Sequence, residues 1–143
     1  MFLDKFRDGQ KGSQVPHHPA GPGPLSGRRV LVVEDEYFLA DDIVRALQAL
    51  GASIVGPFGE LKEATAVVEG DMAIDAAIVD INLRSEMVFS LARVLRMRNV
   101  PFVFTTGYDR ASIVSEFQDV GLWGKPLDIP AMARELTNLI NNH

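Results

Sequence analysis

The chain has 143 residues, of which 47% are hydrophobic and 23% charged, and its formal net charge is −5. This length and composition are typical of one globular domain with a single core. The acidic balance argues against nucleic-acid binding, which needs clustered lysine and arginine. The absence of cysteine excludes disulfides, thiolate metal sites and cysteine catalysis. With no signal peptide and no apolar run near the roughly 20 residues of a membrane span, we expect a cytoplasmic protein that does not enter a membrane.

The first part of the chain has the composition of a flexible segment. Residues 10–27 read QKGSQVPHHPAGPGPLSG, rich in proline, glycine and serine. Such a segment cannot bury enough apolar surface to fold, so we expect residues 1–27 to form a flexible leader and residues 28–143 to form the domain. His17 and His18 have no further ligand types beside them, so we interpret them as part of the leader rather than as a metal site.

From residue 28 onward, short apolar segments alternate with segments of helical periodicity. Strands are predicted at residues 30–33, 53–59, 76–79, 100–107 and 121–124. Helices are predicted at residues 39–50, 61–70, 88–95 and 109–118, and a last one begins at Asp128 as its N-cap. This alternation predicts an α/β fold in which helices cover both faces of a parallel sheet. No block of residues is left over for a second domain.

Polar side chains lie at the carboxyl ends of four of the predicted strands. In chain order they are Glu34, Asp35 and Glu36, then Asp80, then Thr105 and Thr106, and finally Lys125. Functional groups of open α/β sheets gather at the carboxyl ends of the strands, so the acids converge if the first and third strands are neighbours. Carboxylates about 4 Å apart repel by roughly 4 kcal/mol at an effective dielectric constant near 20. Such a cluster therefore needs a proton or a cation.

These side chains indicate phosphoryl transfer. A small set of hard oxygen ligands suits Mg²⁺ better than Zn²⁺ and leaves positions for water and phosphoryl oxygens. The Thr106 hydroxyl can donate a hydrogen bond, and Lys125 is a compact positive charge that can contact a phosphoryl oxygen. A carboxylate at such a site can itself be the nucleophile, which gives an aspartyl phosphate.

Four segments, VLVVEDE, AAIVDINL, FVFTTGY and GKPLD, resemble in their order and spacing the receiver domain of two-component response regulators. The resemblance covers residues 28–141 and implies a doubly wound, flavodoxin-like, five-stranded parallel sheet of order 2-1-3-4-5. It implies that Asp80 accepts a phosphoryl group from a histidine kinase or a phosphotransfer protein. The other positions that it implies are Glu34, Asp35, Asp80 and the backbone carbonyl of Asn82 as Mg²⁺ ligands, and Thr106 and Lys125 as contacts of the phosphoryl group.

The same resemblance implies further features. Gly107 would leave room for Thr106 to approach the phosphoryl group, and the Lys125–Pro126 peptide would be cis. The segment FTTGYD is similar to a Phe-x-Thr-Gly segment found after strand four in a subgroup of alphaproteobacterial receivers. The chain departs from the family at Leu122, because many receivers carry a switching Tyr or Phe three residues before the lysine. The segment INLRSEMVF also lacks the proline and glycine common after the phosphoacceptor.

The leading interpretation is a single-domain response regulator that is phosphorylated on Asp80 and signals by changing its protein-binding surface. Its partners would be a kinase or phosphotransfer protein and a downstream target, while the cognate kinase, the target and the oligomeric state stay open. A degenerate receiver that acts as a docking module is an alternative, which Leu122 favours. We expect the chain to catalyse only its own phosphorylation and dephosphorylation. A phosphohydrolase usually carries a second aspartate at the position where this chain has Asn82. A nucleotide or flavin site would need a glycine-rich first turn, where the chain reads EDEYF.

Three further side chains have simpler interpretations. Glu36 is interpreted mainly as an acid that favours the positive end of the following helix. Tyr108 and Trp123 are interpreted as packing or interface residues rather than as part of the chemistry.

Overall fold

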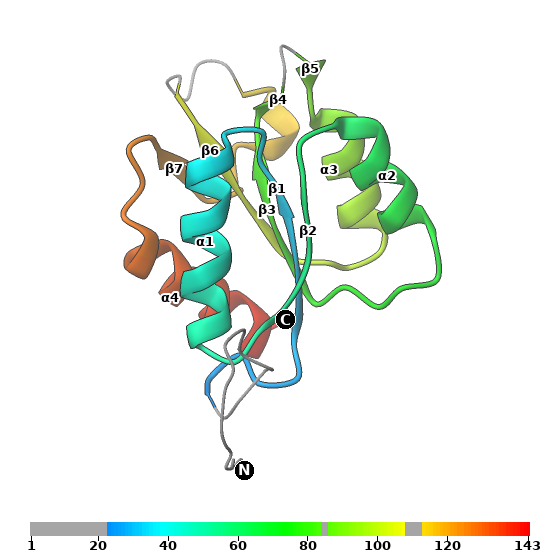
Figure 1. Cartoon of the computed structure of the whole chain (residues 1–143). Coiled ribbons are helices and arrows are strands. Elements are labelled where there is room, and N and C mark those ends of the chain that lie inside the picture. Colours follow the sequence, from blue (N-terminus) through cyan, green and yellow to red (C-terminus); the bar gives the residue numbers. More distant parts are fainter. Residues whose placement is uncertain (1–22, 84–85, 108–112) are drawn as a thin grey trace.

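The computed structural model describes residues 23–83, 86–107 and 113–143. Its main sheet is parallel and five-stranded, in the order β2-β1-β3-β6-β7 (Figure 1). The strands are β1 (Arg29–Val33), β2 (Ser53–Phe58), β3 (Ala76–Asp80), β6 (Phe102–Thr106) and β7 (Leu122–Gly124). Numbered among themselves these strands have the order 2-1-3-4-5, so the α/β fold and its strand order are confirmed.

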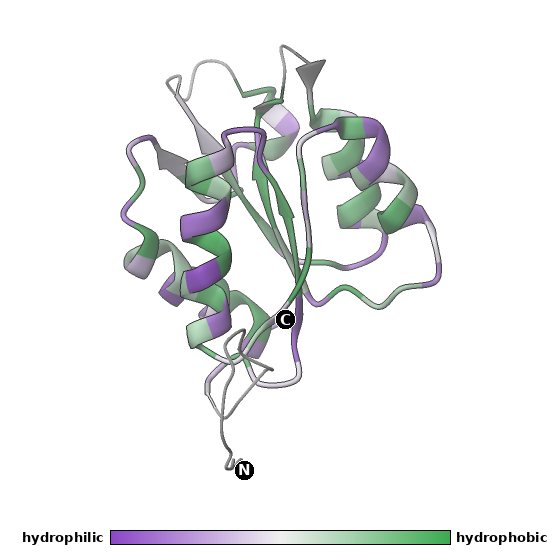
Figure 2. Cartoon of the chain, viewed as in Figure 1, coloured by the Kyte–Doolittle hydropathy of each residue, from purple (hydrophilic) through white to green (hydrophobic). Residues whose placement is uncertain are grey.

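Four α-helices within the described segments cover the sheet, two on each face (Figure 1). They are α1 (Tyr37–Ala49), α2 (Leu61–Glu69), α3 (Phe89–Met97) and α4 (Ile129–Asn141). The two-residue period of a strand sends Val30 and Val32 to the core under α1 and α4, and Leu31 and Val33 to the core under α2 and α3. Residues 30–33 of β1 and 76–79 of β3 are therefore apolar without interruption, and the hydropathy colouring shows the middle of the sheet as hydrophobic (Figure 2).

The register of the sheet brings the polar strand ends to one edge. β1 pairs with β3 so that Val33 is opposite Val79, which places the residues after β1 beside Asp80. Asp80 is in turn opposite Thr105 of β6. Thr106 is opposite Gly124 of β7, and Lys125 comes directly after. Because all five strands are parallel, these residues lie at the same end of the sheet, the end from which α1 begins (Figure 1).

The helix predicted for residues 109–118 is wrong for its described part. Residues 109–112, and Tyr108 before them, lie outside the described residues, and the next described element is a single 3₁₀ turn, Ser115–Phe117. In an α-helix the Ile113 carbonyl would accept a hydrogen bond from the Phe117 N–H. Here it accepts the side-chain amide of Gln118 at 2.7 Å, and the Phe117 N–H donates to Val114 at 3.0 Å. The side-chain bond thus replaces the helical one.

A second difference is a short antiparallel hairpin that the sequence did not predict. It pairs β4 (Asn82–Leu83) with β5 (Glu86–Met87) immediately after Asp80. Two-residue strands are too short to show a period, and this segment has no Gly or Pro turn signal. The hairpin lies at the same end of the sheet as the polar strand ends (Figure 1).

The described part of the predicted leader is packed rather than mobile. Residues 1–22, including His17 and His18, lie outside the described residues. Residues 23–27 form a turn in which Leu25 is fully buried in the core under α1 and α4. The Leu25 N–H donates to the Leu50 carbonyl at 2.9 Å. The expected flexibility therefore does not extend to residues 23–27. None of the helices in the described segments is long and apolar enough to cross a membrane.

Candidate functional site

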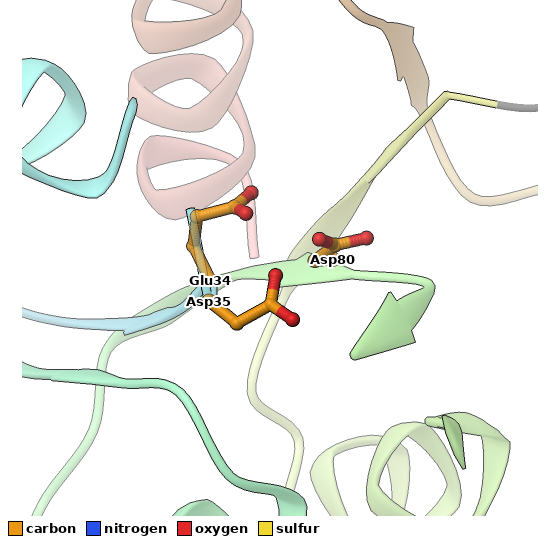
Figure 3. Close-up of side chains that lie close together, drawn as sticks. All are labelled: Glu34, Asp35 and Asp80. Atoms are coloured by element: carbon orange, nitrogen blue, oxygen red, sulfur yellow. The ribbon is translucent and has the colours of Figure 1, made fainter. Parts of the chain in front are cut away.

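Three carboxylates meet at the carboxyl edge of the sheet. Glu34 and Asp35 follow β1 directly, and Asp80 is the last residue of β3. One oxygen from each lies within 4.8 Å of the others, and the three side chains surround a common space (Figure 3). Glu34 and Asp80 are buried, whereas Asp35 is half-buried. The acids that the sequence places at different strand ends are thus neighbours in space.

Lys125 supplies a cation to this cluster from the end of β7. Its Nζ donates to Asp80 Oδ2 at 3.0 Å, to Glu34 Oε2 at 3.2 Å and to Glu36 Oε1 at 2.8 Å. Its own backbone N–H donates to the Thr106 carbonyl at 2.8 Å, which ties the residue to β6. The following Lys125–Pro126 peptide is cis, as the resemblance implied. From the end of β7, the Lys125 side chain therefore passes β6 and contacts the acids at the ends of β3 and β1.

The burial of the cluster changes how readily its groups ionise. Burial raises the pKa of Glu34 to about 7, with a further rise from the Asp80 charge. The Glu36 backbone N–H, which donates to Glu34 Oε2 at 3.0 Å, and the Lys125 charge oppose this rise. Burial alone would lower the pKa of Lys125, but its hydrogen bonds to Glu36 and Asp80 and the Asp80 and Glu34 charges raise it overall. Near neutral pH Lys125 is charged and Glu34 is about half ionised.

The donor set fits a hard divalent cation. Glu34 Oε1 is buried and makes no hydrogen bond within the described structure, although a carboxylate oxygen in that position would normally have a partner. Glu34, Asp35 and Asp80 offer oxygen alone, which suits Mg²⁺, and one lysine does not balance the cluster's charge. These residues would hold the ion, and the ion would neutralise charge at Asp80.

The remaining predicted site residues have less direct support. Thr106 is buried at the end of β6, one residue beyond the residue opposite Asp80. Asn82 lies in β4, two residues after Asp80. The roles of the Thr106 hydroxyl and the Asn82 carbonyl stay predictions. Among the described residues, an added Cβ at Gly107 would meet no heavy atom within 4 Å, so this part of the chain gives no steric reason for glycine there.

Glu36, Trp123 and Leu122 lie near the site and make different contacts. Glu36 occupies the N-cap position of α1 but makes no capping hydrogen bond, so its interpretation as mainly a helix-end acid missed its contact with Lys125. Its position beside two site acids was a signal for that contact. Trp123 packs, as expected, against the core under α1 and α4, and its indole N–H donates to Glu135 at 2.5 Å. Leu122 packs on the opposite face, against the core under α2 and α3.

Comparisons with known proteins point to one family. The chain is 35% identical to SdrG from Sphingomonas melonis Fr1, over 82% of this chain and 98% of that structure, with a TM-score of 0.65. It is 25% identical to the receiver domain of the hybrid histidine kinase CckA, over 78% and 98% of the two chains, with a TM-score of 0.64. It is also 30% identical over 95 residues to the transcriptional regulatory protein PdtaR of Mycobacterium tuberculosis.

The match to PdtaR covers 66% of this chain and 46% of PdtaR, so the chain spans about half the length of the curated relatives it matches. No protein-family model matches the chain. The sheet order, the acid cluster with its lysine and these similarities agree with one another. The chain belongs to the receiver domains of two-component response regulators.

Proposed function

We propose that the chain accepts a phosphoryl group on Asp80 in a Mg²⁺-dependent reaction. The observation that carries the proposal is the position of the Asp80 carboxylate, which is buried beside two other acids and receives a hydrogen bond from Lys125 at 3.0 Å. An Asp80 oxygen would attack the phosphorus of a phosphohistidine on a histidine kinase or a phosphotransfer protein. The phosphorus–nitrogen bond would break, and its electron pair would leave with the imidazole.

The neighbouring residues would contribute binding and charge stabilisation. Glu34, Asp35 and Asp80, with the Asn82 carbonyl, would hold Mg²⁺, which supplies Lewis-acid stabilisation of the phosphoryl oxygens. Lys125 would contact one phosphoryl oxygen, and the Thr106 hydroxyl would donate to another. The chemistry would be limited to the chain's own phosphorylation and dephosphorylation, because Asn82 cannot act as the general acid that a phosphohydrolase needs.

Phosphorylation would act by changing a protein-binding surface. Thr106 ends β6 and Lys125 directly follows β7, the two strands at one side of the sheet, so movement of either side chain would reach the surface around β7. SdrG, a structure 36% identical to this chain, has been solved in a BeF₃-activated conformation. The Phe-x-Thr-Gly segment at residues 104–107 supports membership of the alphaproteobacterial subgroup. The proposed partners are a histidine kinase or phosphotransfer protein and a downstream target protein, all acting in the cytoplasm.

The proposal is tested by incubating the protein with acetyl phosphate and Mg²⁺ and measuring its intact mass. We expect the mass of one phosphoryl group to be gained, in a form that hydroxylamine removes, as it does an acyl phosphate. Asp80→Asn should abolish the gain, and so should EDTA. Asp71→Asn, at an exposed acid in the turn before β3, is the matched control and should be phosphorylated like the wild type. Modification that survives Asp80→Asn would refute the proposal.

A further inference from the structure

The hydrogen bonds of Lys125 leave no donor for an incoming group. An ammonium has three N–H donors and no acceptor. Within the described structure the three nearest acceptors of Lys125 Nζ are three different carboxylates, those of Glu34, Glu36 and Asp80, at 2.8–3.2 Å. If Lys125 is to contact a phosphoryl oxygen, one of these carboxylates has to be displaced. The identity of that carboxylate decides how easily the site accepts a phosphoryl group.

Exposure distinguishes the three carboxylates. The side chains of Glu34 and Asp80 are 1% and 6% exposed, whereas that of Glu36 is 57% exposed. Water can replace Lys125 at Glu36, but it cannot readily do so at the two buried acids, where an unpaired charge would be left without solvent. Glu36 makes the shortest of the three contacts, at 2.8 Å, but it is the exposed carboxylate of the three, so solvent can compensate for the loss of this contact. Glu36 is therefore the partner that Lys125 can release at least cost.

We propose that Glu36 is a positioning residue that holds Lys125 in the unphosphorylated state and competes with the phosphoryl group for it. This inference rests on the proposed function of Asp80. Two buried carboxylates keep Lys125 in place without Glu36, so the loss of Glu36 frees a donor and does not free the side chain. The Glu36 charge also opposes the negative charge that a phosphoryl group brings to the site.

Three variants separate the contact from the charge. Glu36→Gln removes the charge and weakens the bond to Lys125. Glu36→Asp keeps the charge but shortens the side chain, and aspartate at an N-cap accepts hydrogen bonds from the first turn of the helix, which draws it away from Lys125. Glu60→Gln is the matched control, because Glu60 is the exposed N-cap of α2 and, like Glu36, makes no capping hydrogen bond.

Each variant is incubated with acetyl phosphate at saturating Mg²⁺, and the rate of phosphorylation is measured by intact mass. In this reaction an Asp80 oxygen bonds to phosphorus while the bond from phosphorus to the acetyl oxygen breaks, and acetate leaves. Breaking one exposed ion pair changes the rate of such a reaction by a few-fold, and so does removing one nearby charge. We expect Glu36→Gln to be about fivefold faster than the wild type, equal to about 1 kcal/mol. Glu36→Asp should be about two- to threefold faster, and Glu60→Gln should stay within about twofold.

Calorimetric titration with Mg²⁺ alone gives a second readout that does not depend on phosphorylation. Glu36→Gln should bind Mg²⁺ a few-fold more weakly because the site has lost a charge, whereas Glu36→Asp should bind it like the wild type. Glu36→Gln should thus change the phosphorylation rate and the Mg²⁺ affinity in opposite directions, raising the first and lowering the second. A change that merely destabilised α1 would lower the melting temperature without separating these two quantities.

Each outcome of the experiment has one meaning. If the wild type is phosphorylated and Glu36→Gln is unchanged or slower, the inference is wrong and the proposed function stands. If Glu36→Asp matches the wild type while Glu36→Gln is faster, the charge alone matters and the competition for Lys125 is wrong. A Glu60→Gln variant as fast as Glu36→Gln overturns the inference in the same way. A wild type that is never phosphorylated overturns both the inference and the function on which it rests.

Discussion

The pKa of Glu34 predicts that the metal-free protein loses stability as the pH rises from about 5 to 8. Its carboxyl group has a pKa of about 7 in the folded chain, against an ordinary value of 4.5. Between these two values the folded state holds a proton that the unfolded state has released, so the free energy of unfolding falls with increasing pH. At about 1.4 kcal/mol for each pH unit, the full effect is about 3 kcal/mol. Lys125 does not contribute in this range, because its raised pKa adds stability that is lost only above its ordinary value of 10.5.

Urea unfolding in EDTA at pH 5, 6, 7 and 8 measures this effect, with Glu34→Gln as the matched variant. Glutamine has the shape of a protonated glutamate and does not titrate, so the other titrating groups cancel in the difference between the two proteins. We expect the wild type to become less stable relative to Glu34→Gln by about 2–3 kcal/mol between pH 5 and 8. A difference that is flat, or that changes in the opposite direction, would show that Glu34 is not a proton-holding group in the folded chain.

Added Mg²⁺ should reverse most of this loss at pH 8. A ligand that binds only the folded state stabilises it according to its concentration relative to its dissociation constant, and Mg²⁺ needs the ionised carboxylate. The wild type should therefore gain more from Mg²⁺ at pH 8 than at pH 5. Glu34→Gln should gain less than the wild type at pH 8. Equal gains at both pH values would contradict a metal site that includes Glu34.

Three further predictions concern stability, each measured by urea unfolding at pH 7 in EDTA. Lys125→Met should lower the free energy of unfolding by about 2–4 kcal/mol, because Asp80 loses the nearby cation that balances its buried charge. Mg²⁺ should recover part of this loss. An unchanged free energy of unfolding would show that the ion pairs of Lys125 are fully screened. Phe117→Ala should cost about 3–5 kcal/mol, since the ring is buried among other phenylalanines, whereas Met97→Ala at an 81% exposed side chain should cost about 0.5 kcal/mol or less. Leu25→Ala should cost about 2–4 kcal/mol, and a negligible cost would mean that residues 23–27 do not belong to the folded domain.

The sequence predicted the sheet well because its central strands are unambiguous. Residues 30–33 and 76–79 are apolar without interruption, so they fit a strand that is buried on both faces. The helices on either side show a helical period and recognisable ends, and Asp128 does cap α4, accepting the Ala131 N–H at 3.1 Å. Parallel pairing then makes the strand ends neighbours, so the convergence of the acids was predictable.

The errors occur where a contact distant in the sequence overrides a local pattern. Phe117 and its neighbours show helical spacing, yet Arg93 and Arg96 of α3 bind Glu116 and Asp119 and hold the segment as a single turn. Leu25 sits in a proline- and glycine-rich segment but finds a place in the core, which composition alone could not show. The Glu36 contact with Lys125 spans 89 positions along the chain and needed the strand order before it could be predicted.

The core explains why the acid cluster can exist without its cation. The residues of β1 from Val30 to Val33 are fully buried, and each contributes roughly 1.5–3 kcal/mol, about 6–12 kcal/mol together. Three carboxylates make three pairs, each repelling by roughly 4 kcal/mol at about 4 Å, so the core offsets this repulsion together with the charge of Lys125 and the proton on Glu34. We therefore expect the chain in EDTA at pH 7 to keep its helical circular dichroism and one cooperative unfolding transition. A chain that unfolds when the metal is removed would show that the core does not hold the acids together unaided.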